Sequence, residues 1–258
     1  MAYAQFREER PYEPDKQQEV NVTGKGLARI YGYMALGLVI TAGIAILVSW
    51  IFSSHVNSAQ SLQQQNAWVY GYIGMLIGSL VMVLILSIWL PVRLARGKHS
   101  LWVPYILYSI FMGALLSVVL VTGISWAIIG EAFGISAAAF LIMFFIGYFA
   151  KKDFSLGAYI AIGFLSMAAL LAVFWLIFGL LTGGISNLTA YWLDIAVTGI
   201  VCAIMLIFIA IDGYRIKKIA AQGNGTDNLY LFCAYVMYSD FIALLLRVIY
   251  ILARTTRN

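Results

Sequence analysis

Two aspartates, Asp212 and Asp240, lie at the end of or inside long apolar stretches, where an acidic side chain needs a specific partner. A charge at the centre of a membrane-spanning helix costs roughly 2.5–3.5 kcal/mol. Asp240 lies eleven residues into its stretch, which at a rise of 1.5 Å per residue is a depth of about 17 Å. Its side chain is too short to reach water from there. It must face other helices, a cation or water, or carry a proton.

The two aspartates can meet, because the loop between their stretches is long enough for two antiparallel helices to pack side by side. Two acidic groups in apolar surroundings interact strongly, so we expect the pair to share one proton and titrate as a unit. Losing that proton creates a negative site that attracts a cation or drives the helices apart, which makes the pair a candidate gate and proton sensor. Hard cations such as calcium prefer carboxylate oxygens, but two carboxylates predict only weak, transient binding. The alternative is an inert hydrogen bond from protonated Asp240 to a Tyr or Ser.

Further polar residues extend this pattern along the stretch that ends at Asp212. Asp194 lies 18 residues before Asp212, which places both on one face of a helix, with Thr198 close to that face. Asp194 and Glu131 fall in the first turns of their predicted helices. There they can be solvated, interact favourably with the helix dipole, or line an outer entrance.

The stretch that contains Asp240 carries its own stripe. Cys233, Asp240 and Arg247 are spaced by seven residues and share one face of a helix. A polar track facing this stripe suits a cation path, and it equally suits a static ion-pair network. The spacing alone does not separate the two.

The composition requires long apolar helices in a membrane to position these residues. Of the 258 residues, 63% are hydrophobic and only 10% are charged, and the mean hydropathy is +0.92. A soluble domain carries about 25% charged residues, so soluble enzymes, nucleic-acid binders and disordered proteins are excluded. We therefore expect a monomer surrounded by lipid, with no nucleic-acid partner. The aspartate pair adds calcium, as the permeant ion, and protons as its expected partners.

Seven apolar runs are long enough to cross a bilayer, which takes about 20 residues each. They are Leu27–Phe52, Ala67–Leu90, Leu101–Val121, Ile128–Ala150, Leu156–Leu181, Tyr191–Ile211 and Leu229–Leu252. The break at Thr122–Trp126 is weak. The runs do not alternate as barrel strands would, so we predict an all-α polytopic membrane protein. Residues 1–26 form a partly disordered tail, residues 27–252 the membrane domain and residues 253–258 a short second tail.

The basic residues predict the orientation of the chain. They gather in the first tail and in the loops after the second, fourth and sixth runs, whereas the other three loops contain none. The positive-inside rule then places the N-terminus in the cytoplasm and the C-terminus outside. The net charge of +5 is explained by this topology.

Small residues predict where the helices pack. Stripes of such residues let helix backbones approach closely in lipid. The three stripes are Gly74 with Gly78, Ser109 with Gly113 and Ser117, and Gly130 with Gly134.

Known membrane enzymes and retinal proteins fit poorly, so no enzymatic activity is expected. The last run contains no Lys for a retinal Schiff base, and the only histidines, His55 and His99, lie in loops on opposite sides. An intramembrane aspartyl protease also uses two aspartates on adjacent helices. Its Gly-x-Gly-Asp and Pro-Ala-Leu motifs are absent here.

Three segments resemble the Bax inhibitor-1 family, and we expect a bacterial member. Residues Gly130 to Ser155 are similar to its fourth helix and basic loop. The segment Tyr238-Ser239-Asp240-Phe241-Ile242 resembles its Leu-Tyr-Leu-Asp-Phe-Ile-Asn signature, and Asp212 matches the aspartate of its Asp-Thr-Gln signature. The similarity covers roughly residues 25–252.

This resemblance implies a seven-helix bundle with the seventh helix central and a pH-sensitive calcium leak controlled by Asp212 and Asp240. Bacterial relatives lie in the plasma membrane, and some associate with a membrane-bound AAA protease. Eukaryotic relatives lie in the endoplasmic reticulum membrane. The competing hypothesis is a non-conducting regulator that binds a membrane protease or a stress-response partner through its tail.

The chain also departs from the family pattern at two positions. Gly213-Tyr214 stands in place of the Thr-Gln that follows the sixth-helix aspartate, which changes the hydrogen bonding expected around Asp212. Some relatives have an arginine latch in the second helix. Here that run has no basic residue before Arg93, so the latch is not predicted.

Overall fold

A computed structural model describes residues 16–96, 100–150, 157, 187–221 and 226–256. Its elements are α1 (Lys16–Asn57), α2 (Leu62–Arg96), α3 (Trp102–Val121), α4 (Trp126–Phe149), α6 (Asn187–Ala221) and α7 (Asp227–Thr256). Each of the six is long and apolar enough to cross a membrane. The predicted fifth run, Leu156–Leu181, lies outside the described residues apart from residue 157. The all-helical class is confirmed for the described part of the chain.

Several helices extend beyond the apolar runs that predicted them. α1 begins at Lys16, inside the segment expected to be a tail, and α2 begins at Leu62 and continues through Pro91 to Arg96. The polar ends contain Gln, Lys and Arg, which are good helix formers. A helix that leaves the hydrocarbon can continue in water, so hydropathy marks the membrane crossing and not the helix end.

The weak break between the third and fourth runs is a true turn. Gly123 has a φ of +73°, a left-handed conformation that glycine adopts without steric cost. The Ser125 side chain then caps α4 by accepting a hydrogen bond from the Ile128 N–H at 3.3 Å. The predicted division of these two spans is confirmed.

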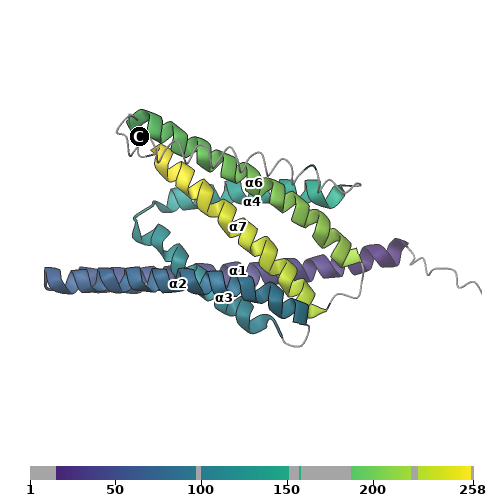
Figure 1. The fold of residues 1–258 in the computed structure, drawn as a ribbon, viewed down its shortest axis with the longest axis horizontal. Coiled ribbons are helices and arrows are strands. Elements are labelled where there is room, and N and C mark those ends of the chain that lie inside the picture. The colour runs from purple at the N-terminus through teal and green to yellow at the C-terminus, as the bar shows by residue number, and fades with distance from the viewer. Residues whose placement is uncertain (1–15, 97–99, 151–156, 158–186, 222–225, 257–258) are drawn as a thin grey trace, which may run out of the picture.

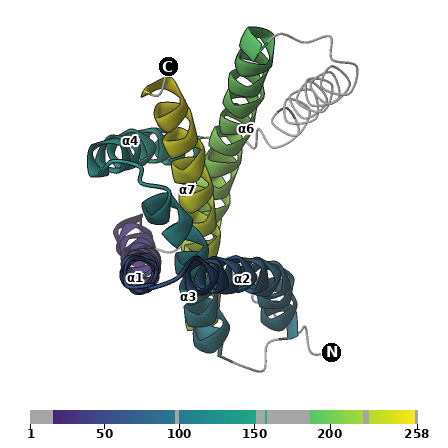
Figure 2. The ribbon, with the colours of Figure 1, turned by 90° about the vertical axis from the view of Figure 1, so that its left-hand side faces the viewer.

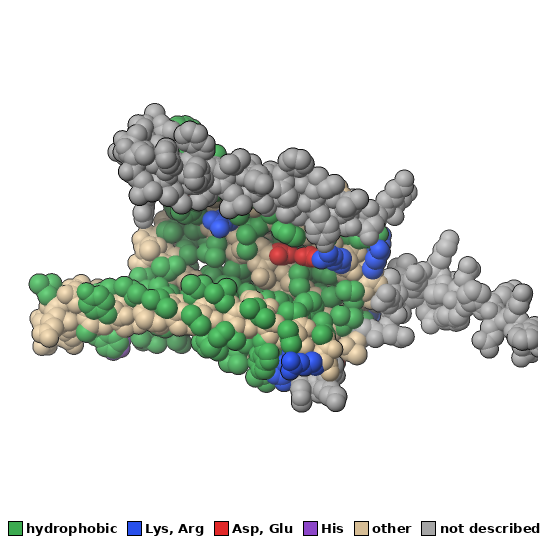
Figure 3. All heavy atoms as spheres, viewed as in Figure 1, with side chains coloured by type: hydrophobic (Ala, Val, Ile, Leu, Met, Phe, Trp, Pro, Cys, Tyr) green, Lys and Arg blue, Asp and Glu red, His purple; other side chains and the backbone are tan. Residues whose placement is uncertain are grey.

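The helices form two groups with α7 running obliquely between them (Figures 1 and 2). α1, α2 and α3 pack together on one side, and α4 packs on α6 on the other. α7 contacts each of the other five described helices and is buried along much of its length. The start of α1 and the end of α7 lie at opposite ends of the structure (Figure 1). The surface between the ends is largely apolar (Figure 3).

Only one of the three predicted small-residue stripes forms a described helix contact. Ser109, Gly113 and Ser117 are buried, and a Cβ on Gly113 would lie 2.6 Å from the Thr41 carbonyl oxygen of α1. Gly74 with Gly78 and Gly130 with Gly134 form no such contact with a described helix, because an added Cβ would have no described atom within 4 Å. Both pairs lie on helix faces that no described helix covers.

Candidate functional site

The two predicted gate residues lie on the seam between α6 and α7, toward the end of α6 and in the middle of α7. Asp212 of α6 is half-buried, and its Oδ1 lies 3.4 Å from the Arg215 guanidinium one turn later. The side chain of Arg215 is 55% exposed, whereas that of Asp212 is only 16% exposed. Asp212 therefore forms an ion pair at the edge of the seam with an arginine whose side chain is exposed to solvent.

Asp240 of α7 is half-buried and lies on the α7 side of the seam, near Asp212. Its Oδ2 is shielded from solvent and has no hydrogen-bond partner within the described residues. The carboxyls of Asp240 and Asp212 lie close enough for each to act on the ionisation of the other. The chain therefore brings the two predicted residues together from helices joined only by a loop.

The expectation of a buried aspartate pair needs correction. Both residues are half-buried, and Asp212 has an ion-pair partner that the sequence pattern did not predict. The physical reason is the position of Arg215 at i+3, on the same helix face and near the polar end of α6. Figure 3 shows acidic and basic side chains side by side on an otherwise largely apolar face.

Two glycines fix the position of α6 beside this site. A Cβ on Gly147 of α4 would collide with the backbone of Ala210, and one on Gly213 would lie 2.8 Å from the Phe144 carbonyl oxygen. The backbone of α4 therefore contacts the backbone of α6 on both sides of Asp212. Gly213, which replaces a Thr in the family pattern, is needed here for that close approach.

The opposite end of the same seam contains Asp194, the predicted entrance residue. The Tyr250 hydroxyl donates a hydrogen bond to Asp194 Oδ2, and the Arg254 Nε lies 3.7 Å from the same oxygen. Thr198 is buried and donates to the Asp194 carbonyl oxygen at 2.9 Å. Asp194 therefore joins α6 to α7, and Tyr250 and Arg254 are partners that the sequence pattern did not reveal.

The remaining predicted residues form no described hydrogen bond or ion pair with either cluster. Arg247 is exposed on α7 and lies within electrostatic reach of Cys202 of α6. Glu131 is exposed on α4, and no described contact joins it to the seam. Cys233, one stripe position from Asp240, is buried and close enough to Asp212 to feel its charge.

A tyrosine cluster behind Asp240 was also missed. Tyr238 is fully buried, and its hydroxyl bonds Thr41 of α1, whose own hydroxyl donates to the Ser109 carbonyl oxygen of α3 at 3.1 Å. Ser239 lies 3.4 Å from the Tyr108 hydroxyl. The signal was present in the sequence, because a tyrosine inside an apolar run needs a partner for its hydroxyl.

Tyr238→Phe tests this cluster. Thr41 uses its single proton on Ser109, so Tyr238 is the donor to Thr41, and its loss should cost about 1 kcal/mol. In a chain of this size, the melting temperature in detergent should fall by about 2–4 °C. Tyr70→Phe, at a residue that is 72% exposed, is the matched control and should leave it unchanged. Equal melting temperatures for the two variants would show that the hydroxyl chain contributes nothing.

The described residues hold no ready-made metal centre. No group of three or more His, Cys, Asp or Glu side chains is close enough within them to hold an ion. Within the described residues, the carboxylates of Asp212 and Asp240 are the nearest approach to a cation site.

Six long apolar helices, with acidic residues gathered on the seam between two of them, define a multi-pass α-helical membrane protein. The family model described as inhibitor of apoptosis-promoting Bax1 matches residues 23–257. The chain therefore belongs to the Bax inhibitor-1 family, as its motifs indicate.

Two relatives from Escherichia coli share one name. The chain is 26% identical over 230 residues to the inner membrane protein YbhL of Escherichia coli strain K12, covering 85% of this chain and 87% of the relative. The YbhL protein of Escherichia coli O6:H1 matches with the same identity and coverage.

Proposed function

We propose that this protein is a pH-sensitive leak pathway for calcium and other cations in a bacterial plasma membrane. The α6–α7 seam would form the path, and Asp212 with Asp240 the gate and proton sensor. The observation that carries this proposal concerns Oδ2 of Asp240, which is shielded from solvent and has no hydrogen-bond partner among the described residues. The Asp240 carboxyl lies close to that of Asp212.

The charges around this oxygen explain how a gate would work. Arg215 can neutralise one carboxylate, so a second ionised carboxylate at Asp240 would leave an uncompensated charge in apolar surroundings. A proton on Asp240 removes this cost when the seam is closed. Once the proton leaves, a cation can take its place. With two carboxylates as ligands, binding would be weak enough for the ion to pass on.

The surrounding topology belongs to the same proposal. We infer seven spans with α7 central, a cytoplasmic N-terminus, an outer C-terminus, a monomeric state and no enzymatic activity. The contacts of α7 with each other described helix support this arrangement, and so do the opposite positions of the start of α1 and the end of α7 (Figure 1). The name of the relatives as inner membrane proteins supports the membrane assigned.

Ion flux into liposomes tests the function. Purified protein should carry calcium faster than protein-free liposomes, and the rate should rise with pH as the seam loses its proton. A chain lacking residues 1–15, with all of α1 retained, should conduct equally well. If flux matches protein-free liposomes at every pH while the full chain captures a membrane protease, the non-conducting regulator is the correct reading.

A further inference from the structure

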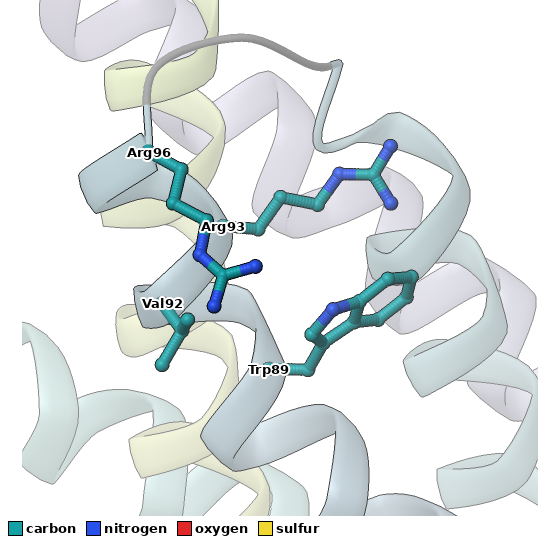
Figure 4. Close-up of a pocket in the computed structure, with 4 residues that line it drawn as sticks. All are labelled: Trp89, Val92, Arg93 and Arg96. Carbon is teal, nitrogen blue, oxygen red and sulfur yellow. The ribbon is translucent and has the colours of Figure 1, made fainter.

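The inner end of α2 holds a second polar site, far along the chain from the aspartates. Trp89, Val92, Arg93 and Arg96 line a pocket of about 290 Å³ there (Figure 4). Figure 4 shows both guanidinium groups extending from this end of the helix, with the Trp89 indole beside that of Arg93. Neither arginine has an acidic partner among the described residues.

Arg93 has unused hydrogen-bonding capacity at this pocket. Its guanidinium carbon lies 4.9 Å from the centre of the Trp89 ring, so a cation–π contact holds the group in place. Its Nε is shielded from solvent and has no acceptor within the described part of the chain. A fixed guanidinium with free N–H groups suits a ligand that carries only acceptor oxygens, and phosphate has this geometry.

The pocket opens onto the lipid-facing side of the helix. Trp89 and Val92 are 41% and 40% exposed. Earlier in α2, exposed apolar residues recur every three or four positions and therefore form one stripe along the helix. This stripe leads away from the pocket and consists of Ile77, Val81, Leu84 and Ile88. Lipid hydrocarbon would contact the stripe, and the lipid phosphate would contact the two arginines beyond the end of the stripe. A tryptophan between the apolar and the charged part, as Trp89 is, is typical of the membrane interface.

We propose that this pocket binds the phosphate of an anionic phospholipid, whose acyl chains lie along the exposed stripe of α2. The two arginines supply the charge, Trp89 positions one of them, and the stripe explains why the ligand is a lipid and not a soluble phosphate. This site is independent of the aspartate pair and of ion conduction.

Native mass spectrometry of the full chain in detergent tests the proposal, with phosphatidylglycerol and phosphatidylcholine as the added lipids. Phosphatidylglycerol should be retained preferentially, and Arg93→Gln with Arg96→Gln should lower its retention about tenfold, to the phosphatidylcholine level. The matched control is Lys25→Gln with Arg29→Gln. This pair removes two exposed charges from α1, whose start lies toward the same end of the molecule as the end of α2 (Figure 1). It should change retention little.

Several outcomes would overturn the site. Equal retention by the wild type and the Arg93/Arg96 variant would show that these arginines bind no lipid. An equal loss in the Lys25/Arg29 variant would show general charge attraction only. Inorganic phosphate or glycerol phosphate that displaces the lipid at equimolar amounts would make the site one for a soluble anion. Each variant must have the same elution volume and helix content as the wild type, which shows that it is folded.

Discussion

Asp240→Asn is expected to abolish the pH dependence of calcium flux in reconstituted liposomes. The shielded Oδ2 of Asp240 has no described partner, so the protonation of this group should set the charge of the seam. Asparagine is similar in shape but cannot ionise. Where the wild-type rate changes by up to about tenfold per pH unit, the limit for one titrating proton, the variant rate should stay flat. Flux at several pH values, at equal protein insertion, measures the effect.

Two variants control this experiment. Asp227→Asn makes the same change on the same helix at an exposed residue, which forms an ion pair with the exposed Arg29, and it should keep the wild-type pH profile. Asp240→Glu keeps the carboxyl and should retain pH dependence, which separates loss of the titrating group from loss of the fold. A wild-type pH profile in Asp240→Asn would remove Asp240 from the gate.

Gly147→Ala is expected to destabilise the protein strongly, although it adds only one methyl group. A Cβ at this position collides with the backbone of Ala210, which cannot rotate away as a side chain would. Alanine favours a helix over glycine by about 1 kcal/mol, but overpacking a tight contact costs about 1–3 kcal/mol and more when backbone must move. We expect a net loss of about 2 kcal/mol or more, measured as a lower melting temperature in detergent.

Gly134→Ala is the matched control on the same helix. A Cβ added to Gly134 would have no described atom within 4 Å, so the same substitution should be neutral or slightly stabilising. Opposite signs for the two variants would confirm that α4 meets α6 at Gly147. Equal stability would mean that the close approach beside Asp212 is not present in the membrane.

Local sequence patterns predicted the crossings well and their ends poorly. The apolar runs correspond to α1 through α4, α6 and α7, because a segment in hydrocarbon must satisfy its own backbone hydrogen bonds and therefore forms a helix. The starts of α1 and α2 were missed. Beyond the hydrocarbon, water tolerates both helix and coil, and hydropathy does not distinguish between them.

The candidate site shows the same division between local and distant information. Spacing placed Asp194 and Asp212 on one face of α6, and burial depth singled out Asp240. The partners that complete each cluster were not visible, because Arg254, Tyr250 and Thr41 come from parts of the chain whose register depends on packing.

The sequence by itself determined the class of protein, the family, most of its membrane crossings and the two acidic residues that need an explanation. Those properties depend on composition and on spacing within one helix. Tertiary structure alone decided that Gly147, and not Gly130 or Gly134, meets another described backbone, and that an oxygen of Asp240 is left without a described partner. Contacts between helices depend on their crossing positions, which no periodicity within a single helix specifies.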